Sequence, residues 1–148
     1  MTRTDKEHYF FGSVLLLANK LQVWGDGILP TLTFKQLFLL LFIKEMEIQN
    51  PTVKEISDFT GTSRQNVKKM LERLEAAEFV SLTRSKADSR AWNVALTEKS
   101  FEYFAENEQK STEIVSEMFS GITDKELDLA MQTAGKLFSF LECSGQSS

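Results

Sequence analysis

Cysteine and histidine are nearly absent from this sequence, which holds one residue of each, Cys143 and His8. One cysteine cannot form a disulfide within the chain, and a structural zinc site takes about four cysteine or histidine ligands. The same scarcity, with no glycine-rich phosphate loop, leaves no residue constellation typical of catalysis. We therefore expect a protein that is not an enzyme and that has no catalytic residues, metal site or cofactor.

Long apolar segments are also missing. The strongest run, residues 37–43, is far shorter than the roughly 20 residues that cross a bilayer. Residues 1–8 are polar and do not resemble the start of a secretory signal. Hydrophobic residues make up 42% and charged residues 26% of the chain, as in ordinary globular proteins. We expect a cytoplasmic protein without a membrane partner, folded as a single domain over residues 1–148.

The chain has no overall excess of positive charge, since its net charge is −4. Residues 63–90 nevertheless contain seven basic and four acidic side chains, a local balance of +3 that leaves −7 on the remainder. Phosphate backbones are bound by Lys and Arg, which replace their counterions. This asymmetry indicates a basic surface that binds nucleic acid, on a protein whose remaining surface is acidic and repels it.

Apolar residues at three- and four-residue steps predict a first helix over 8–24, which a Gly-Asp-Gly sequence ends. A second, largely buried helix begins after the N-cap Thr33 and stops at an Asn-Pro pair. Two long helices, 98–119 and 124–141, precede a polar end, 144–148, that we expect to fray. These two closing helices have more apolar residues than the small wing and reading head could cover, which indicates a partner chain.

Two short helices follow the Asn-Pro pair. Thr52 and Glu55 form a capping box, in which each side chain satisfies a free backbone donor of the other, and this opens a helix that ends at Gly61. Glycine takes the left-handed turn conformation without steric cost. A second cap at Thr62 opens the next helix near Ser63. Two short helices joined by a tight turn predict a helix-turn-helix.

Two short strands come next. Residues 79–84 and 91–96 each alternate apolar with polar or small side chains, and the polar, basic segment 85–90 lies between them. This pattern predicts a β-hairpin with a basic tip, the wing of a winged helix-turn-helix.

The predicted fold is mainly α-helical with a small β-hairpin wing. A winged helix-turn-helix occupies residues 33–97, with its reading head in 51–97, and dimerisation helices occupy 5–25 and 98–143.

The second helix of the helix-turn-helix has side chains suited to DNA. In the major groove Arg can pair with guanine and Asn or Gln with adenine, while Ser, Thr and Lys hold phosphates. The helix N-terminus also attracts phosphate. The alternative is a solvated basic face with two capping residues, but the capped turn and the following wing favour DNA reading. The candidate DNA-binding residues of this helix are Thr62, Ser63, Arg64, Gln65, Asn66, Lys68 and Lys69.

The predicted wing contributes four further candidates, Arg84, Lys86, Asp88 and Arg90. Asp88 and Arg90 are two residues apart, so in an extended strand they project to one side and could pair. An Arg at the tip could enter the minor groove of A·T-rich DNA. The alternative is an exposed salt bridge worth ~0–1 kcal/mol.

Several segments together resemble the MarR family of bacterial transcriptional regulators, in order and spacing over nearly the whole chain. They are residues 32–36, 51–56, 61–67, 71–75, 88–90 and 96–98. The resemblance implies a homodimer formed by the first and last two helices, two heads that read a pseudo-palindromic operator in double-stranded DNA, and repression relieved by a small-molecule effector. It also implies that Arg90 reaches the minor groove and that Asp88 steadies it. Glu78 and Phe79 stand where the family usually has glycine, which puts the wing angle in question.

Three other interpretations compete with parts of this prediction. A winged helix used only for protein interaction would not need basic residues concentrated on one helix face. Cys143 has no basic neighbour in sequence to activate it, which favours a buried or merely tolerated thiol over an oxidation sensor. Six aromatic residues could line an effector pocket, although packing is the commoner role of such stripes. They are Phe10, Phe11, Trp24, Phe34, Phe38 and Phe42.

Overall fold

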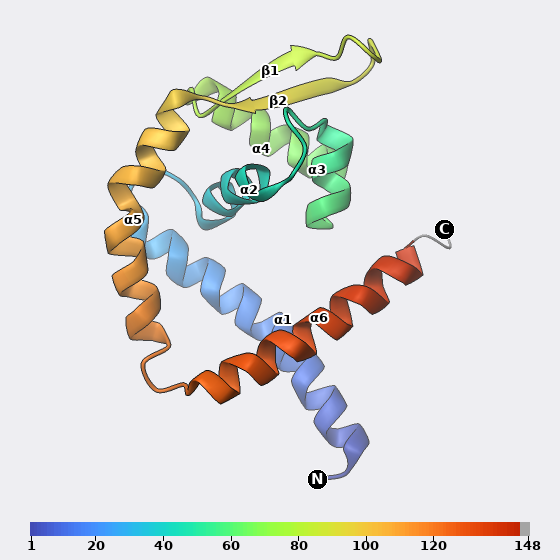
Figure 1. Cartoon of the computed structure of the whole chain (residues 1–148), viewed down its shortest axis with the longest axis vertical. Coiled ribbons are helices and arrows are strands. Elements are labelled where there is room, and N and C mark those ends of the chain that lie inside the picture. Colours follow the sequence, from blue (N-terminus) through green and yellow to red (C-terminus); the bar gives the residue numbers. More distant parts are fainter. Residues whose placement is uncertain (146–148) are drawn as a thin grey trace. The chain divides into compact units, whose positions relative to one another are not determined.

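The computed structural model describes residues 1–145, which form six helices and one two-stranded hairpin (Figure 1). They fall into two compact units, Met1–Tyr103 and a second that begins at Phe104. The mainly helical fold with a hairpin wing is confirmed; the assignment of all residues to one domain stays a prediction. The elements are α1 (Arg3–Ile28), α2 (Phe34–Glu45), α3 (Val53–Thr60), α4 (Arg64–Ala76), β1 (Val80–Arg84), β2 (Trp92–Leu96), α5 (Glu98–Met118) and α6 (Asp124–Gly145).

The prediction that the first helix ends at its Gly-Asp-Gly sequence is wrong. Helix α1 continues through that sequence to Ile28. Gly25 is buried, and a Cβ at this position would collide with the ring of Phe34. The carboxylate of Asp26 accepts a hydrogen bond of 2.7 Å from the backbone N–H of Phe34. The sequence predicted to stop α1 instead lets α2 begin directly against it.

Helix α2 begins after Thr33, as predicted, with a capping box between Thr33 and Gln36. It ends at Glu45, earlier than expected. Asn50 has a φ of 50°, in the left-handed region that Asn tolerates better than most residues. The residue before a proline is disfavoured in the helical region. The chain has therefore already left the helix when it reaches Pro51.

The turn between α3 and α4 is closed by side chains as well as by glycine. Gly61 ends α3 with a φ of 71°, and the hydroxyl of Ser57 donates a 2.6 Å hydrogen bond to the carbonyl of Thr62. The N-cap of α4 is Ser63, whose hydroxyl accepts from the backbone N–H of Asn66. The predicted cap at Thr62 is wrong by one residue, because Ser57 draws Thr62 into the turn.

Helix α4 ends in a Schellman motif. The N–H of Glu78 donates to the carbonyl of Glu75, and the N–H of Phe79 donates to that of Leu74. Glu78 has a φ of 65°, the conformation that glycine usually supplies at this position. The turn into the wing therefore keeps its geometry although the glycine is replaced.

One apolar core lies in the first unit, beneath the hairpin (Figure 1). Strands β1 and β2 pair antiparallel, from Val80 opposite Leu96 to Arg84 opposite Trp92. The carboxylate of Glu75 on α4 accepts from the N–H of Leu82. The buried apolar residues are Leu32, Leu39, Leu40, Ile43, Ile56, Val67, Leu71, Leu74, Phe79, Val80 and Val94. The wing is therefore fixed to the helix-turn-helix by its packing and by side-chain hydrogen bonds.

Helix α6 lies in the second unit and begins with the predicted cap, in which the hydroxyl of Thr123 and the carboxylate of Glu126 bond each other's backbone N–H. The hydroxyl of Thr123 also donates to the Glu126 carboxylate, and this bond, together with the one from the Thr123 backbone N–H, lowers the pKa of Glu126 below its usual value. The helix continues to Gly145, so the expected fraying at Ser144 is wrong there, and residues 146–148 lie outside the described residues. Along residues 1–145, no helix combines the length and apolar character that a bilayer crossing needs.

Candidate nucleic-acid interface

Helix α4 divides into a buried face and a solvent face. Val67, Leu71 and Leu74 are buried against the core. The exposed residues of the first turns are Ser63, Arg64, Gln65, Asn66, Lys68 and Lys69, and Thr62 before them is half-buried. All the candidates predicted on this helix therefore lie on one exposed surface or beside it.

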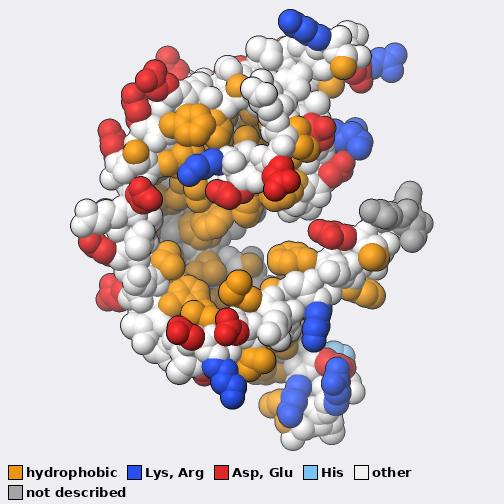
Figure 2. Space-filling model, in the orientation of Figure 1, with side chains coloured by type: hydrophobic (Ala, Val, Ile, Leu, Met, Phe, Trp, Pro, Cys, Tyr) orange, Lys and Arg blue, Asp and Glu red, His pale blue; other side chains and the backbone are white. Residues whose placement is uncertain are grey.

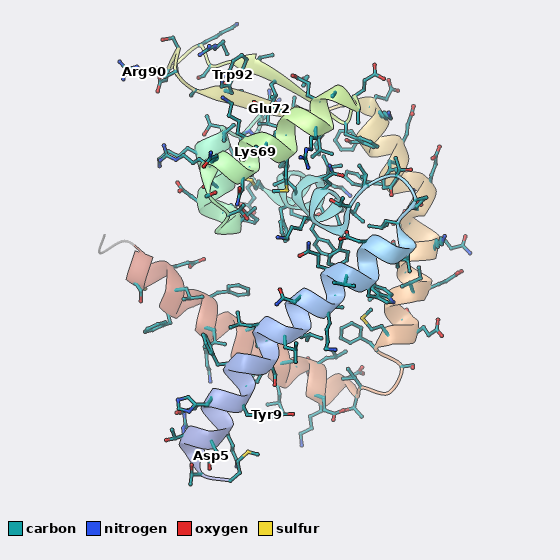
Figure 3. The ribbon with its side chains drawn as sticks, turned by 180° about the vertical axis from the view of Figure 1, so that it is seen from behind. Asp5, Tyr9, Lys69, Glu72, Arg90 and Trp92 are labelled. Atoms are coloured by element: carbon teal, nitrogen blue, oxygen red, sulfur yellow. The ribbon has the colours of Figure 1, made fainter. Side chains whose placement is uncertain are left out.

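Two of the candidate DNA-binding cations on α4 have no carboxylate partner among the described residues. Lys68 lies 4.0 Å from Glu72, one helical turn further along, and both are well exposed. Among the described residues, Arg64 and Lys69 form no ion pair. Figure 3 shows Lys69 and Glu72 along the same helix. An exposed ion pair such as Lys68–Glu72 contributes ~0–1 kcal/mol to stability, so a phosphate can readily replace the carboxylate as the partner of Lys68.

Arg84 braces the wing. Its guanidinium carbon lies 4.3 Å from the centroid of the Trp92 ring, directly across the hairpin. One of its terminal nitrogens donates a 2.8 Å hydrogen bond to the carbonyl of Ser89 in the tip. Cation–π and hydrogen-bond contacts together hold the strand end and the loop in one arrangement. Arg84 thus supports the wing internally, and sequence reasoning missed its partner Trp92, which only the strand register reveals.

Asp88 steadies Arg90 through the main chain. Its carboxylate accepts a 2.9 Å hydrogen bond from the backbone N–H of Arg90, and its own carbonyl accepts from the N–H of Ala91. Such a carboxylate–backbone contact two residues on is an Asx turn. The extended strand assumed for an Asp88–Arg90 side-chain pair is absent, because residues 88–91 turn back toward Ser85. The predicted side-chain geometry is therefore wrong.

The side chains of Lys86 and Arg90 are exposed at the tip of the hairpin. Arg90 projects from the end of the loop into solvent in Figure 3, and Figure 2 shows lysine and arginine side chains at that end. Neither residue has an ion pair within the described part of the chain. The tip therefore presents two free cations on a braced loop.

Metal-ligating groups do not gather on this surface. Across residues 1–145 no three His, Cys, Asp or Glu side chains are placed to hold a metal ion. The surface offers amides, hydroxyls and cations, which are the groups that bind phosphates and base edges.

Comparison with known proteins supports this description. A family model described as MarR family matches residues 31–91, which run from the start of α2 to the tip of the wing. No curated protein sequence matches the chain.

Solved structures of similar fold extend over almost the whole chain. The transcriptional regulator BldR from Sulfolobus solfataricus is 17% identical, with a TM-score of 0.79, and the match covers 94% of this chain and 99% of BldR. MepR from S. aureus, in complex with DNA, is 16% identical with a TM-score of 0.76, covering 89% and 97%. Bordetella bronchiseptica BpsR, whose DNA binding is regulated by 6-hydroxynicotinic acid, is 21% identical with a TM-score of 0.71, covering 86% and 97%. At these identities the likeness establishes the fold.

Proposed function

Because residues 31–91 match the MarR family and the fold is that of solved regulators, we propose that this protein is a sequence-specific, DNA-binding transcriptional regulator. One observation carries the proposal. On a chain of net charge −4, the candidate residues of the capped helix α4 and of the wing tip include four cations without ion pairs among the described residues. They are Arg64, Lys69, Lys86 and Arg90.

Helix α4 would lie in the major groove with its N-terminus toward the bases. Arg64, Gln65 and Asn66 stand in its first turn, where a recognition helix reaches base edges. Arg can donate two hydrogen bonds to guanine, and Gln or Asn can pair with adenine. Lys68 and Lys69, further along the helix, are suited to phosphates, and Ser63 and Thr62 stand at the positive end of the helix dipole.

The wing would follow the neighbouring minor groove. Arg90 at its tip matches the negative potential of a narrow A·T-rich groove. Arg84 and Asp88 hold the loop in one conformation, so the loop is already ordered before DNA binds. Lys86 would contact the flanking phosphates.

The protein would act as a homodimer on a pseudo-palindromic operator. Helix α1 buries only Gly25, and α6 buries none of its residues within the single chain. Large apolar side chains that are more than half exposed include Tyr9, Phe11, Leu16, Met131, Phe138 and Phe140. An exposed apolar surface of this kind is typical of a protein interface. Two heads held by such a dimer would read half-sites about 34–36 Å apart.

Control by a small molecule is part of the proposal. The regulation of DNA binding in BpsR by 6-hydroxynicotinic acid supports an effector for a protein of this fold. We propose that the dimer represses transcription in the cytoplasm until an effector releases it from DNA.

Substitution of two α4 residues tests the assignment. Target duplexes would first be selected from random DNA, and binding measured by fluorescence anisotropy. We expect Arg64→Ala to lose discrimination between target and scrambled duplexes by about 1–3 kcal/mol, because it removes a base contact. Lys69→Ala should weaken both duplexes alike, because it removes a phosphate contact.

Lys110→Ala is the matched control, since Lys110 is exposed on α5, outside the winged helix. It should leave both affinities unchanged. If Arg64→Ala and Lys69→Ala both bind like the parent, α4 is not the reading helix, and a protein-interaction module becomes the better account.

A further inference from the structure

The turn that leads from α4 into the wing is bound by the start of α5. Three consecutive carbonyls of this turn each accept a hydrogen bond from a side chain of residues 97–100. In Figure 1 the first turn of α5 lies beside the end of α4 and the start of β1. All these residues belong to the first unit. The acceptors are Ala77, Glu78 and Phe79, and the donors, which we call the clamp, are Lys99, Thr97 and Ser100.

Lys99 and Thr97 bind the first two carbonyls. The ammonium of Lys99 donates a 2.7 Å hydrogen bond to the carbonyl of Ala77, the C-cap residue of α4. The hydroxyl of Thr97 donates a 2.6 Å hydrogen bond to the carbonyl of Glu78. The last carbonyls of a helix have no partner within that helix, and a cation near them interacts favourably with the helix dipole. The start of α5 therefore supplies partners that the end of α4 lacks.

Ser100 binds the third carbonyl from inside the core. Its hydroxyl donates to the carbonyl of Phe79, and within the described part of the chain Ser100 is the only polar or charged residue that is buried. The ring of Phe79 is also buried and lies edge-on to Tyr103, with centroids 5.6 Å apart. The ammonium of Lys99 lies 4.8 Å from the centroid of the Phe79 ring. A buried hydroxyl costs stability unless it is hydrogen-bonded, so the placement of Ser100 depends on this carbonyl.

The clamp surrounds a residue in an unfavourable backbone conformation. Glu78 has a φ of 65°, in the left-handed region that residues with a Cβ rarely adopt and that glycine takes without steric cost. Its side chain is exposed and forms no ion pair or hydrogen bond in the part of the chain that the structure describes. The Glu78 side chain therefore does not hold the backbone. The hydrogen bonds to its own carbonyl and to the carbonyls on both sides do.

We propose that Thr97, Lys99 and Ser100 are positioning residues for DNA binding, which hold the turn after α4 in the left-handed conformation that sets the direction of the wing. The inference rests on the proposed function for its consequence. With the turn fixed, α4 can occupy the major groove while Arg90 reaches the minor groove. Without the clamp, Glu78 relaxes to an ordinary conformation and the wing changes direction. DNA then binds only the fraction of molecules in which the wing is aligned.

Substitutions of Ser100 and Lys99 test the clamp on DNA. Ser100→Ala removes the buried donor, and Lys99→Met removes the surface donor while it keeps a long side chain. Each should weaken binding of the selected duplex about 2–10-fold in fluorescence anisotropy, the worth of one hydrogen bond. Lys99 is exposed, so Lys99→Met tests the proposal even if Ser100→Ala does not fold. Lys110→Met makes the same change at an exposed position of α5 outside the winged helix, and it should bind like the parent.

Glu78→Gly distinguishes positioning from general support of the core. Glycine takes the left-handed conformation without the clamp, so in the Glu78→Gly protein Ser100→Ala should weaken DNA binding by less than about twofold. Glu78→Gly alone should bind like the parent. A serine that only filled the core would cause the same loss with either residue at position 78. Circular dichroism would confirm that each variant folds.

The base pairs beside the half-sites report on the direction of the wing. Two duplexes would share the selected half-sites, and one would have G·C pairs where the other has flanking A·T pairs. The parent should prefer the A·T flanks, because Arg90 enters a narrow minor groove. Ser100→Ala should lose most of that preference. It should still discriminate the target half-sites from scrambled ones, because the base contacts of α4 remain.

Amide hydrogen exchange tests the clamp without DNA. The backbone N–H of Phe79 donates to the carbonyl of Leu74 and becomes free to exchange when the turn opens. Ser100→Ala and Lys99→Met should each speed this exchange about 2–10-fold. Glu78→Gly should slow it, because an opened turn no longer relieves an unfavourable conformation. Lys110→Met should leave it unchanged.

Three results would overturn the proposal. They are DNA binding like the parent in both clamp variants, an equal loss from Ser100→Ala in the parent and Glu78→Gly proteins, and unchanged exchange at Phe79. The two proposals fail separately. A parent that binds no duplex contradicts the regulator function, and faster exchange in the clamp variants would still support their hold on the turn. A parent that binds duplex no better than its clamp variants contradicts the positioning role alone.

Discussion

Asp88 illustrates how a single residue at the wing tip acts through the backbone. Its carboxylate bonds the N–H of Arg90, while the Arg90 side chain extends into solvent (Figure 3). If the tip faces DNA as proposed, a negative charge there repels phosphate, so Asp88 must contribute something other than charge. The hydrogen bond that shapes the turn is that contribution.

Two substitutions of Asp88 distinguish its hydrogen bond to the Arg90 backbone from a side-chain ion pair with Arg90. Asp88→Asn keeps an oxygen acceptor for the Arg90 N–H, so we expect it to bind DNA at least as tightly as the parent. Asp88→Ala removes the acceptor and should weaken binding about 2–10-fold, the worth of one hydrogen bond. Fluorescence anisotropy on one duplex compares the three proteins. If Asp88→Asn binds DNA as weakly as Asp88→Ala, a side-chain ion pair with Arg90 is the better explanation.

At the scale of elements, α1 and α2 approach each other closely because Gly25 has no side chain. The backbone of α1 passes against the Phe34 ring, and Asp26 holds the first turn of α2. This contact positions α2, which carries the neighbouring rings of Phe34, Phe38 and Phe42.

Alanine substitution at two glycines of α1 tests that contact. Gly25→Ala should lower the free energy of unfolding by about 1–2 kcal/mol, because the clash with Phe34 outweighs the gain in helix propensity. Gly12→Ala lies in the same helix with no atom within 4 Å, so it should raise stability by about 0.5–1 kcal/mol. Urea unfolding at one protein concentration compares them. Equal stability of the two variants would contradict the packing role of Gly25.

The sequence predicts those elements whose signals are local. The caps at Thr33, Thr52 and Thr123 involve residues three apart in the chain, and all three are found as predicted. The alternation of the two strands likewise depends on neighbouring residues, and the hairpin follows it.

Features that depend on a distant partner could not be predicted. Gly25 looks like a helix stop until Phe34 is placed against it. The cap of α4 moves to Ser63 because the Ser57 hydroxyl binds Thr62. Within the candidate site, residue types and exposure were predictable on α4, whereas the Arg84–Trp92 contact requires the strand register.

At the scale of the whole molecule, the dimer proposal rests on the exposed apolar side chains of α1 and α6. We expect the protein to sediment as a dimer. Phe140 is 68% exposed in the single chain, so Phe140→Glu should leave the monomer folded. Burial of that charge should raise the dimer dissociation constant at least about a hundredfold.

Phe140→Leu is the matched control, because it keeps an apolar side chain at the same position, and it should remain a dimer. Sedimentation velocity distinguishes the three proteins. A parent that sediments as a monomer at micromolar concentration would contradict the dimer proposal.

The central claim, that a basic surface on an acidic protein binds DNA, is tested most directly by a salt series. Anisotropy of a labelled duplex would be measured with the parent protein as the salt concentration rises. If Arg64, Lys69, Lys86 and Arg90 replace counterions, the logarithm of the binding constant should fall linearly with the logarithm of salt, with a slope of roughly −3 to −4 per head. A binding constant that stays flat across the series would contradict the claim.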